Sequence, residues 1–148
     1  MVSKWLGLVG LMGSVLIGCG SYGTESDLPN IVGTWRATRA DVTSVSNPAT
    51  TQELIAQGLT FTLVLNANLT CVVTTAIPGE GTEVSSGTYA QAASSLVLTF
   101  TSPTPTSIQT FGLALSGATL TLTGGDITYD FGSGTEVASK LNLVLVRQ

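Results

Sequence analysis

Apolar and polar residues alternate with a period of two along most of the chain after residue 30, a pattern typical of half-buried β-strands. The segment 59–65 shows it most clearly, with Leu or Phe at every second position and Thr or Val between them. Gly, Pro, Asn and Ser separate such segments at regular intervals, which indicates turns. The expected strands are residues 31–43, 58–66, 69–76, 83–91, 95–101, 107–115, 118–131 and 137–147.

Short strands joined by short turns predict an all-β fold, either a sandwich or a barrel. An even number lets the first and last strands pair antiparallel, so we expect an up-and-down antiparallel eight-stranded barrel. A ninth strand would leave a parallel seam, and the choice between eight and nine stays open here. We assign residues 31–148 to one domain, because 148 residues suffice for one substantial core.

Residues 50–58 break the alternation and predict one short helix. Thr50 with Glu53 three residues later fits a capping box, and Leu54 and Ile55 continue the helical turn. Gly58 stands where a helix-ending glycine is common. We expect this helix to cap one end of the barrel with its two apolar side chains.

The segment 118–131 changes phase at Gly124 and Gly125, because its apolar residues occupy even positions before this pair and odd positions after it. Either a tight hairpin at the two glycines or one long strand with a one-residue bulge produces that change. The expected pairing with the last strand also shifts by one residue across the glycines. That shift favours a single bent strand.

Residues 1–18 have the composition of a secretory signal peptide. Lys4 supplies a positive charge, and Trp5–Ile17 is an apolar run too short to span a bilayer as a helix. The sequence Leu16-Ile17-Gly18-Cys19 resembles the bacterial lipobox. That resemblance implies cleavage before Cys19 and acylation of its thiol and its new amine; an ordinary signal peptide with a coincidental cysteine is the alternative.

The residues that follow Cys19 indicate the membrane to which a lipoprotein would be sorted. Gly20 and Ser21 follow the cysteine, so no aspartate stands second, which resembles an outer-membrane address in bacteria that sort lipoproteins by that position. Two or more acyl chains make a stable anchor. We therefore expect a monomeric protein of the cell envelope, held to the outer membrane through Cys19, with residues 19–30 as lipidated cysteine and flexible tether.

Composition argues against several classes of function. Only 9% of the residues are charged and the net charge is −4, so the chain lacks the basic face that nucleic-acid binding requires. It has no histidine, the commonest general base and metal ligand. A serine or cysteine nucleophile would need Lys140 as its base, and Lys140 is out of phase with the inward leucines. We expect no enzymatic activity, no cofactor and no resident metal.

Three polar groups have more than one interpretation. Cys71 shares phase with apolar neighbours and is expected to be a small buried residue rather than a reactive thiol. An acidic group near residues 132–136 offers oxygen ligands for calcium, but it lacks the spacing of a dedicated loop, so a solvated acidic turn is favoured. Arg39 and Asp41 either lie inside the barrel mouth as a polar handle for a ligand or turn outward at a bulge. The acidic group consists of Asp126, Asp130 and Glu136.

At Gly33-Thr34-Trp35 the chain resembles the lipocalin-like superfamily, whose first strand opens with Gly-x-Trp. That family also has an arginine near the end of the last strand, lying over the tryptophan, and Arg147 fits this position. Over about residues 31–147 the whole pattern is similar to that of the small lipocalin-like lipoproteins of bacterial envelopes. The resemblance therefore implies that the eight-stranded barrel is lipocalin-like. It implies that Trp35 and Arg147 form a structural pair that closes one end of the barrel. The family's Thr-Asp-Tyr motif is absent from the sequence.

The resemblance also implies a small hydrophobic ligand inside the barrel. The expected inward residues are apolar enough to line a cavity and equally apt to fill a core, because both need the same alternation. We therefore expect either a lipid-anchored envelope protein that binds a small hydrophobic molecule, or a non-enzymatic structural or interaction lipoprotein with a filled barrel. The candidate cavity residues are Phe61, Leu63, Leu98, Phe111, Leu113 and Tyr129.

Overall fold

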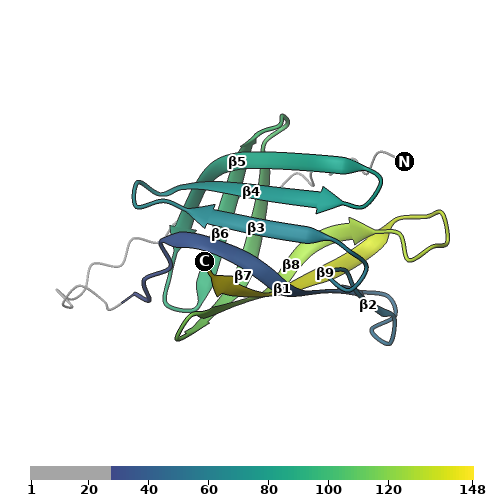
Figure 1. Cartoon of the computed structure of the whole chain (residues 1–148). Coiled ribbons are helices and arrows are strands. Elements are labelled where there is room, and N and C mark those ends of the chain that lie inside the picture. Colours follow the sequence, from purple (N-terminus) through teal and green to yellow (C-terminus); the bar gives the residue numbers. More distant parts are fainter. Residues whose placement is uncertain (1–27) are drawn as a thin grey trace, which may run out of the picture.

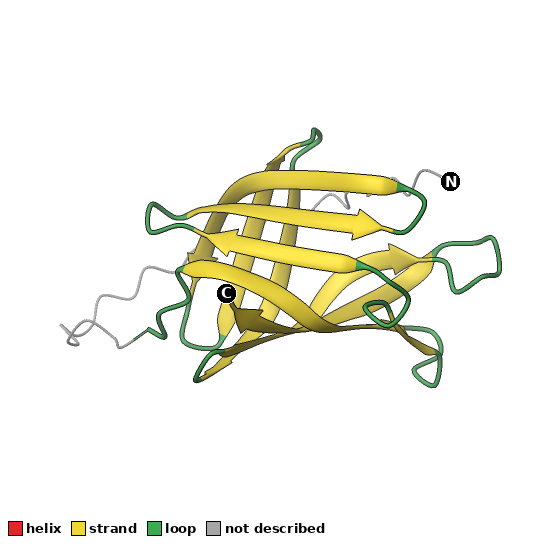
Figure 2. Cartoon of the chain, in the orientation of Figure 1, coloured by secondary structure: helices red, strands yellow, loops and turns green. Residues whose placement is uncertain are grey.

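The alternating segments form a closed antiparallel β-barrel in the computed structural model, which describes residues 28–148 (Figure 1, Figure 2). Eight strands follow one another around the barrel in chain order, and the last pairs with the first. The expected eight-stranded barrel is confirmed. The strands of this ring are β1 (Gly33–Ser44), β3 (Thr60–Leu65), β4 (Thr70–Ile77), β5 (Gly81–Gln91), β6 (Ser95–Ser102), β7 (Ser107–Ser116), β8 (Thr119–Tyr129) and β9 (Val137–Arg147).

An additional short strand, β2 (Thr51–Glu53), brings the number of strands within residues 28–148 to nine. It pairs antiparallel with Asp41–Thr43 of β1, beyond the stretch of β1 that pairs with β3. The ring therefore closes through β1 and β9 without a parallel seam. Within the same residues no helix is long and apolar enough to cross a membrane.

The two ends of the barrel differ in what covers them. We call one the closed end: residues 28–32, the β3–β4, β5–β6 and β7–β8 turns and the C-terminus lie there, the last marked C in Figure 1. Ile31 is only 1% exposed and plugs this end, and Gln91 donates a hydrogen bond to the Pro29 carbonyl at 2.7 Å. We call the other the open end, where the β1–β2, β2–β3, β4–β5, β6–β7 and β8–β9 connections lie.

The core occupies the half of the barrel nearest the closed end. Apolar residues at every second position point inward there and are buried. Nearer the open end, Val42 and Ser139 of the β1–β9 side are still buried, whereas inward residues such as Phe61 and Tyr129 are partly exposed. This packing explains why the alternation in the sequence predicts the strands, because along most strands the inward positions are the buried ones. The largest fully buried side chains include Trp35, Leu63, Leu65, Leu96, Leu120, Leu122, Leu143 and Leu145.

Bulges bend three strands. The pairing of β8 with β9 shifts between Leu122 and Gly125, so the expected single bent strand is confirmed. At Gly125 the Phe111 ring lies where a Cβ would stand, 2.2 Å from that position, so glycine is needed for close packing. A second shift, between Ser86 and Gly87, bends β5 against β6, and a third interrupts β1.

The helix expected over residues 50–58 is not present and has to be corrected. Residues 51–53 extend into β2, and residues 54–58 make a single turn. Leu59 N–H donates to the Leu54 carbonyl at 3.0 Å, and Gly58 N–H donates to the Ile55 carbonyl at 2.9 Å. This is the pattern with which helices end, and Gly58 has the expected left-handed φ of +94°. The pairing of β2 with β1 uses the residues that would have formed the first helical turn.

Candidate functional site

The closed end contains the pair that the family resemblance implied. Trp35 is fully buried on β1, and the guanidinium carbon of Arg147 lies 4.4 Å from the centre of its ring. The two residues are direct partners across the β1–β9 seam. Trp35 Nε1 donates to the Ile31 carbonyl at 2.8 Å, so the indole is held on its polar edge as well.

Arg147 also fastens the entry segment of the chain. Its guanidinium donates to the carbonyls of Val32 at 2.5 Å and Asn30 at 2.7 Å. Gly33 makes room for it, because a Cβ there would stand 2.9 Å from Arg147 Nη1, and its φ of +143° suits glycine. The structure thus explains both fixed residues of the Gly-x-Trp sequence: Gly33 leaves room for the Arg147 guanidinium, and Trp35 fills the core beneath it.

Replacing Arg147 with alanine is expected to shift the Trp35 emission to longer wavelengths, because water can then reach the face of the indole that the guanidinium covers. The stability loss should be smaller than that of removing Trp35, since a cation over an aromatic ring contributes only about 0.5–2 kcal/mol. Arg147→Lys keeps the charge but loses the planar guanidinium, so its stability and emission should lie between those of the wild type and Arg147→Ala. Unchanged emission in Arg147→Ala would contradict this role. Fluorescence of the chain from residue 20 to 148 reports Trp35 alone, since Trp5 is removed.

The six candidate cavity residues divide into two groups. Leu63, Leu98, Phe111 and Leu113 are at most 7% exposed and belong to the core cluster. Phe61 and Tyr129 lie nearer the open end, are partly buried and pack against that cluster.

A pocket of about 270 Å³ lies at the open end. Its residues come from the β2–β3 turn, the end of β4 with the turn that follows, and the end of β8. Gly58 packs so closely on Pro78 that a Cβ would stand 2.7 Å from Pro78 Cγ, which joins two of these walls. Of the six candidate cavity residues, Tyr129 is the one that lines this pocket. The lining residues are Leu54, Gln57, Leu59, Ile77, Pro78 and Tyr129.

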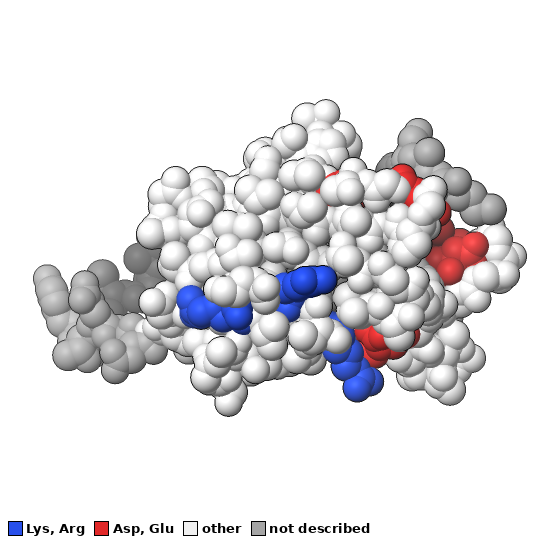
Figure 3. Space-filling model, in the orientation of Figure 1, with Lys and Arg blue, Asp and Glu red and all other residues white. Residues whose placement is uncertain are grey.

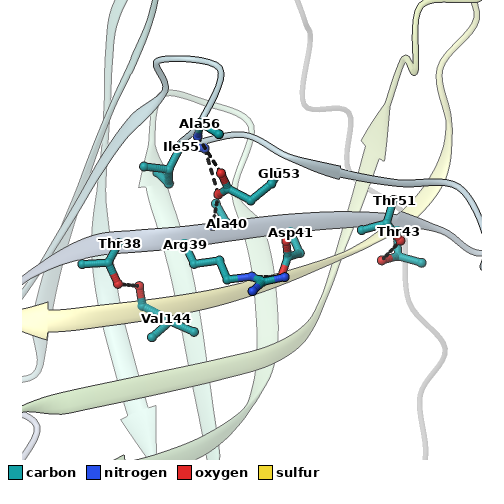
Figure 4. A network of polar contacts seen from close by, with 10 residues as sticks. All are labelled: Thr38, Arg39, Ala40, Asp41, Thr43, Thr51, Glu53, Ile55, Ala56 and Val144. Atoms are coloured by element: carbon teal, nitrogen blue, oxygen red, sulfur yellow. Dashed lines mark hydrogen bonds and ion pairs between the residues drawn. The ribbon is translucent and has the colours of Figure 1, made fainter.

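Glu53 positions the turn that forms one wall of the pocket (Figure 4). Its carboxylate accepts backbone hydrogen bonds from Ala40 at 2.8 Å, Ile55 at 3.0 Å and Ala56 at 2.5 Å. Burial opposes ionisation, but the three N–H donors together with the charge of Arg39 outweigh it and hold the pKa of Glu53 below its ordinary value. The carboxylate therefore ties the turn to β1.

Arg39 and Asp41 do not lie inside the barrel. The bulge in β1 between Ala37 and Arg39 reverses the phase, so that Ala40 and Val42 point inward and the charged pair lies on the outer face. The two form an ion pair with Arg39 Nε 2.6 Å from Asp41 Oδ2, and the Arg39 side chain is 63% exposed (Figure 4). The outward interpretation of this pair is confirmed.

The three carboxylates near the β8–β9 loop have separate roles. Asp130 accepts the N–H groups of Gly132, Ser133 and Gly134 at 2.8–3.0 Å and so organises the loop. Asp126 forms an ion pair with Lys140, and Glu136 accepts a hydrogen bond from Thr128 at 2.9 Å. Residues 28–148 contain no group of three or more acidic, cysteine or histidine side chains placed to hold a metal ion.

Cys71 is buried near the closed end at 1% exposure. Burial raises the pKa of its thiol, with a smaller opposing effect from the Gly87 backbone. A buried thiol with a raised pKa is a poor nucleophile.

The Lys140 side chain is 44% exposed and lies beside Asp126 on the outer face.

The residues that reasoning from sequence missed are those of the open end. Leu54 was assigned to a helix, and Gln57, Leu59, Ile77 and Pro78 were assigned no role in a site. They meet only through the closure of the barrel, so no local pattern identifies them. Cys19 lies outside the described residues. Comparison with known proteins yields no family model that matches the chain and no curated protein that matches it.

Proposed function

We propose that the protein is a lipid-anchored, lipocalin-like barrel of the bacterial cell envelope that binds a small apolar molecule at its open end. The observation that carries the binding proposal is the pocket of about 270 Å³ lined by Leu54, Leu59, Ile77 and Tyr129. Ligand pockets in proteins are typically concave and mostly apolar, with volumes from about 300 Å³. A pocket slightly below that range suits a small ligand.

The position of the pocket is compatible with an anchor at Cys19. The described chain begins with residue 28 at the closed end, on the opposite side of the barrel from the pocket. An anchor nine residues before Leu28 therefore leaves the open end accessible to ligands. The Gly-x-Trp sequence, the Trp35–Arg147 contact and the eight-stranded ring support the lipocalin-like assignment.

A filled barrel with a structural or interaction role is the second candidate. It is favoured by the burial of Leu63, Leu98, Phe111 and Leu113 in the core cluster. The two candidates differ in one measurable respect, because only the first requires a small apolar molecule to bind at the open end.

Binding at the pocket is tested with N-phenyl-1-naphthylamine, a neutral apolar probe that fluoresces when it leaves water. The chain from residue 20 to 148 is expected to bind it with micromolar affinity. Gln57→Trp places bulk in the pocket from an exposed position, so it should abolish binding while the melting temperature is kept. Ala56→Trp is the matched control, because Ala56 is exposed on the same turn but does not line the pocket. Equal binding by both variants, or none by the wild type, would favour the filled barrel.

Anchoring is tested by Cys19→Ser in the full-length chain. The wild type should incorporate a fatty-acid probe and partition into detergent, because acylation supplies the hydrocarbon that holds it to a membrane. The variant should remain as unlabelled precursor. A wild-type protein that is water-soluble and unlabelled, with cleavage at another position, would contradict the lipoprotein assignment. Cys71→Ser is the control, and it should label normally because that thiol is buried in the barrel.

A further inference from the structure

Charge is distributed unevenly along the barrel. All seven acidic residues in residues 28–148 lie in the half nearest the open end, and red surface accordingly gathers on the right of Figure 3. Two of the four basic residues, Arg39 and Lys140, are paired with Asp41 and Asp126 on the outer face. The acidic residues are Asp41, Glu53, Glu80, Glu83, Asp126, Asp130 and Glu136.

Glu83 is the acidic residue that the strand register places on the inner face near the pocket. The strand register aligns Phe61 of β3 with Thr75 of β4 and Thr75 with Glu83 of β5. Thr75 has the phase of the buried Cys71 and the pocket residue Ile77, so this row, Glu83 included, lies on the inner face of the sheet. Glu83 is exposed and carries neither a side-chain hydrogen bond nor an ion pair among the described residues.

A second carboxylate acts on the opposite wall. Asp130 directly follows Tyr129, which lines the pocket. Burial raises the pKa of the Tyr129 hydroxyl, and the negative charge of Asp130 raises it further. The negative charge of Asp130 therefore acts on one residue that lines the pocket. No lysine or arginine of the described residues lines the pocket.

We infer that the open-end pocket takes an amphiphile with a cationic, ammonium-type head on a small apolar body and discriminates against anionic ones such as fatty acids. The apolar body lies against Leu59 and Ile77, and the positive head lies at the rim beside Glu83. This inference rests on the proposed binding function and adds the charge class of its ligand. An anion in the same place would bring two negative groups together in a partly desolvated site, which is unfavourable.

The test is a displacement experiment with two ligands of equal chain length. Octylammonium and octanoate compete with N-phenyl-1-naphthylamine for the chain from residue 20 to 148 at neutral pH. At an ionic strength of about 0.01 M, octylammonium is expected to displace the probe with an inhibition constant about tenfold lower than octanoate. The difference should shrink in about 0.15 M salt, because exposed charges are screened.

Two variants assign the preference to a residue. Glu83→Gln should bring the two inhibition constants together, whereas Asp126→Asn removes an equal charge from the outer face and should leave the preference in place. Equal displacement by the two ligands in the wild type, or a preference that survives Glu83→Gln, would overturn the inference while the proposed function stands. Failure of the neutral probe to bind would instead overturn the proposed function, and the charge preference with it.

Discussion

Trp35→Ala is expected to destabilise the folded barrel by about 3–5 kcal/mol, the largest loss of any single substitution considered. The ring is fully buried where β1, β3 and β9 meet. The Arg147 guanidinium covers one face of the ring, and the Ile31 carbonyl accepts a hydrogen bond from its Nε1. Total stabilities of small domains are about 5–15 kcal/mol, so much of the protein should be unfolded at 37 °C. Urea unfolding of the chain from residue 20 to 148, followed by circular dichroism, measures the loss, since this variant has no tryptophan.

Trp35→Phe separates packing from hydrogen bonding in the same experiment. It keeps an aromatic ring in the core but removes the donor to the Ile31 carbonyl, so a smaller loss than for alanine is expected. A Trp35→Ala protein as stable as the wild type would mean that this ring does not close the barrel.

Gly87→Ala is expected to be the second most damaging change. A Cβ at this position would stand 1.9 Å from the Thr99 carbonyl oxygen and 2.8 Å from the Phe100 Cα, both of them backbone atoms of β6. The β5–β6 pair has to separate to admit it, so a loss of about 3 kcal/mol, the upper end of typical overpacking, is expected from urea unfolding.

Gly112→Ala is the matched control for this prediction. Its added Cβ would stand 2.6 Å from Thr123 Oγ1, a side-chain atom that can rotate away, so the loss should be clearly smaller. Equal losses for the two variants would show that the close approach of the β6 backbone at Gly87 does not determine the cost.

The strands were predictable from the sequence because the barrel buries every second residue along most of them. The bend in β8 was predictable for the same reason, since Gly124 and Gly125 reverse the phase within one strand. The direction of Arg39 and Asp41 was not, because the bulge at Thr38 involves no glycine or other local signal. Phase alone therefore left two interpretations of that pair open.

The helix over residues 50–58 was predicted from capping signals that the structure uses differently. Glu53 does cap the N–H groups of a turn, and Gly58 does end it. The same carboxylate also accepts a hydrogen bond from Ala40 of β1, a tertiary contact that local sequence cannot show. Pairing of residues 51–53 with β1 leaves too few residues for a helix.

The candidate site was only partly predictable. Trp35 and Arg147 are distant in sequence, and a family resemblance was needed to connect them. The pocket residues come from two separate connections and two strand ends. The alternation pattern does not distinguish inward residues that fill a core from those that line an opening. Tyr129 was identified because it shares the inward phase; Gln57 and Pro78 have no such phase, since they lie in turns.

The central claim is that an apolar molecule binds at the open end, and methyl NMR of the chain from residue 20 to 148 tests it most directly. Titration with N-phenyl-1-naphthylamine is predicted to shift the methyl resonances of Leu54, Leu59 and Ile77, which line the pocket. The methyl groups of Leu120 and Leu145, fully buried in the core, should stay in place. Shifts confined to the core leucines, or no shifts at saturating probe, would contradict the claim.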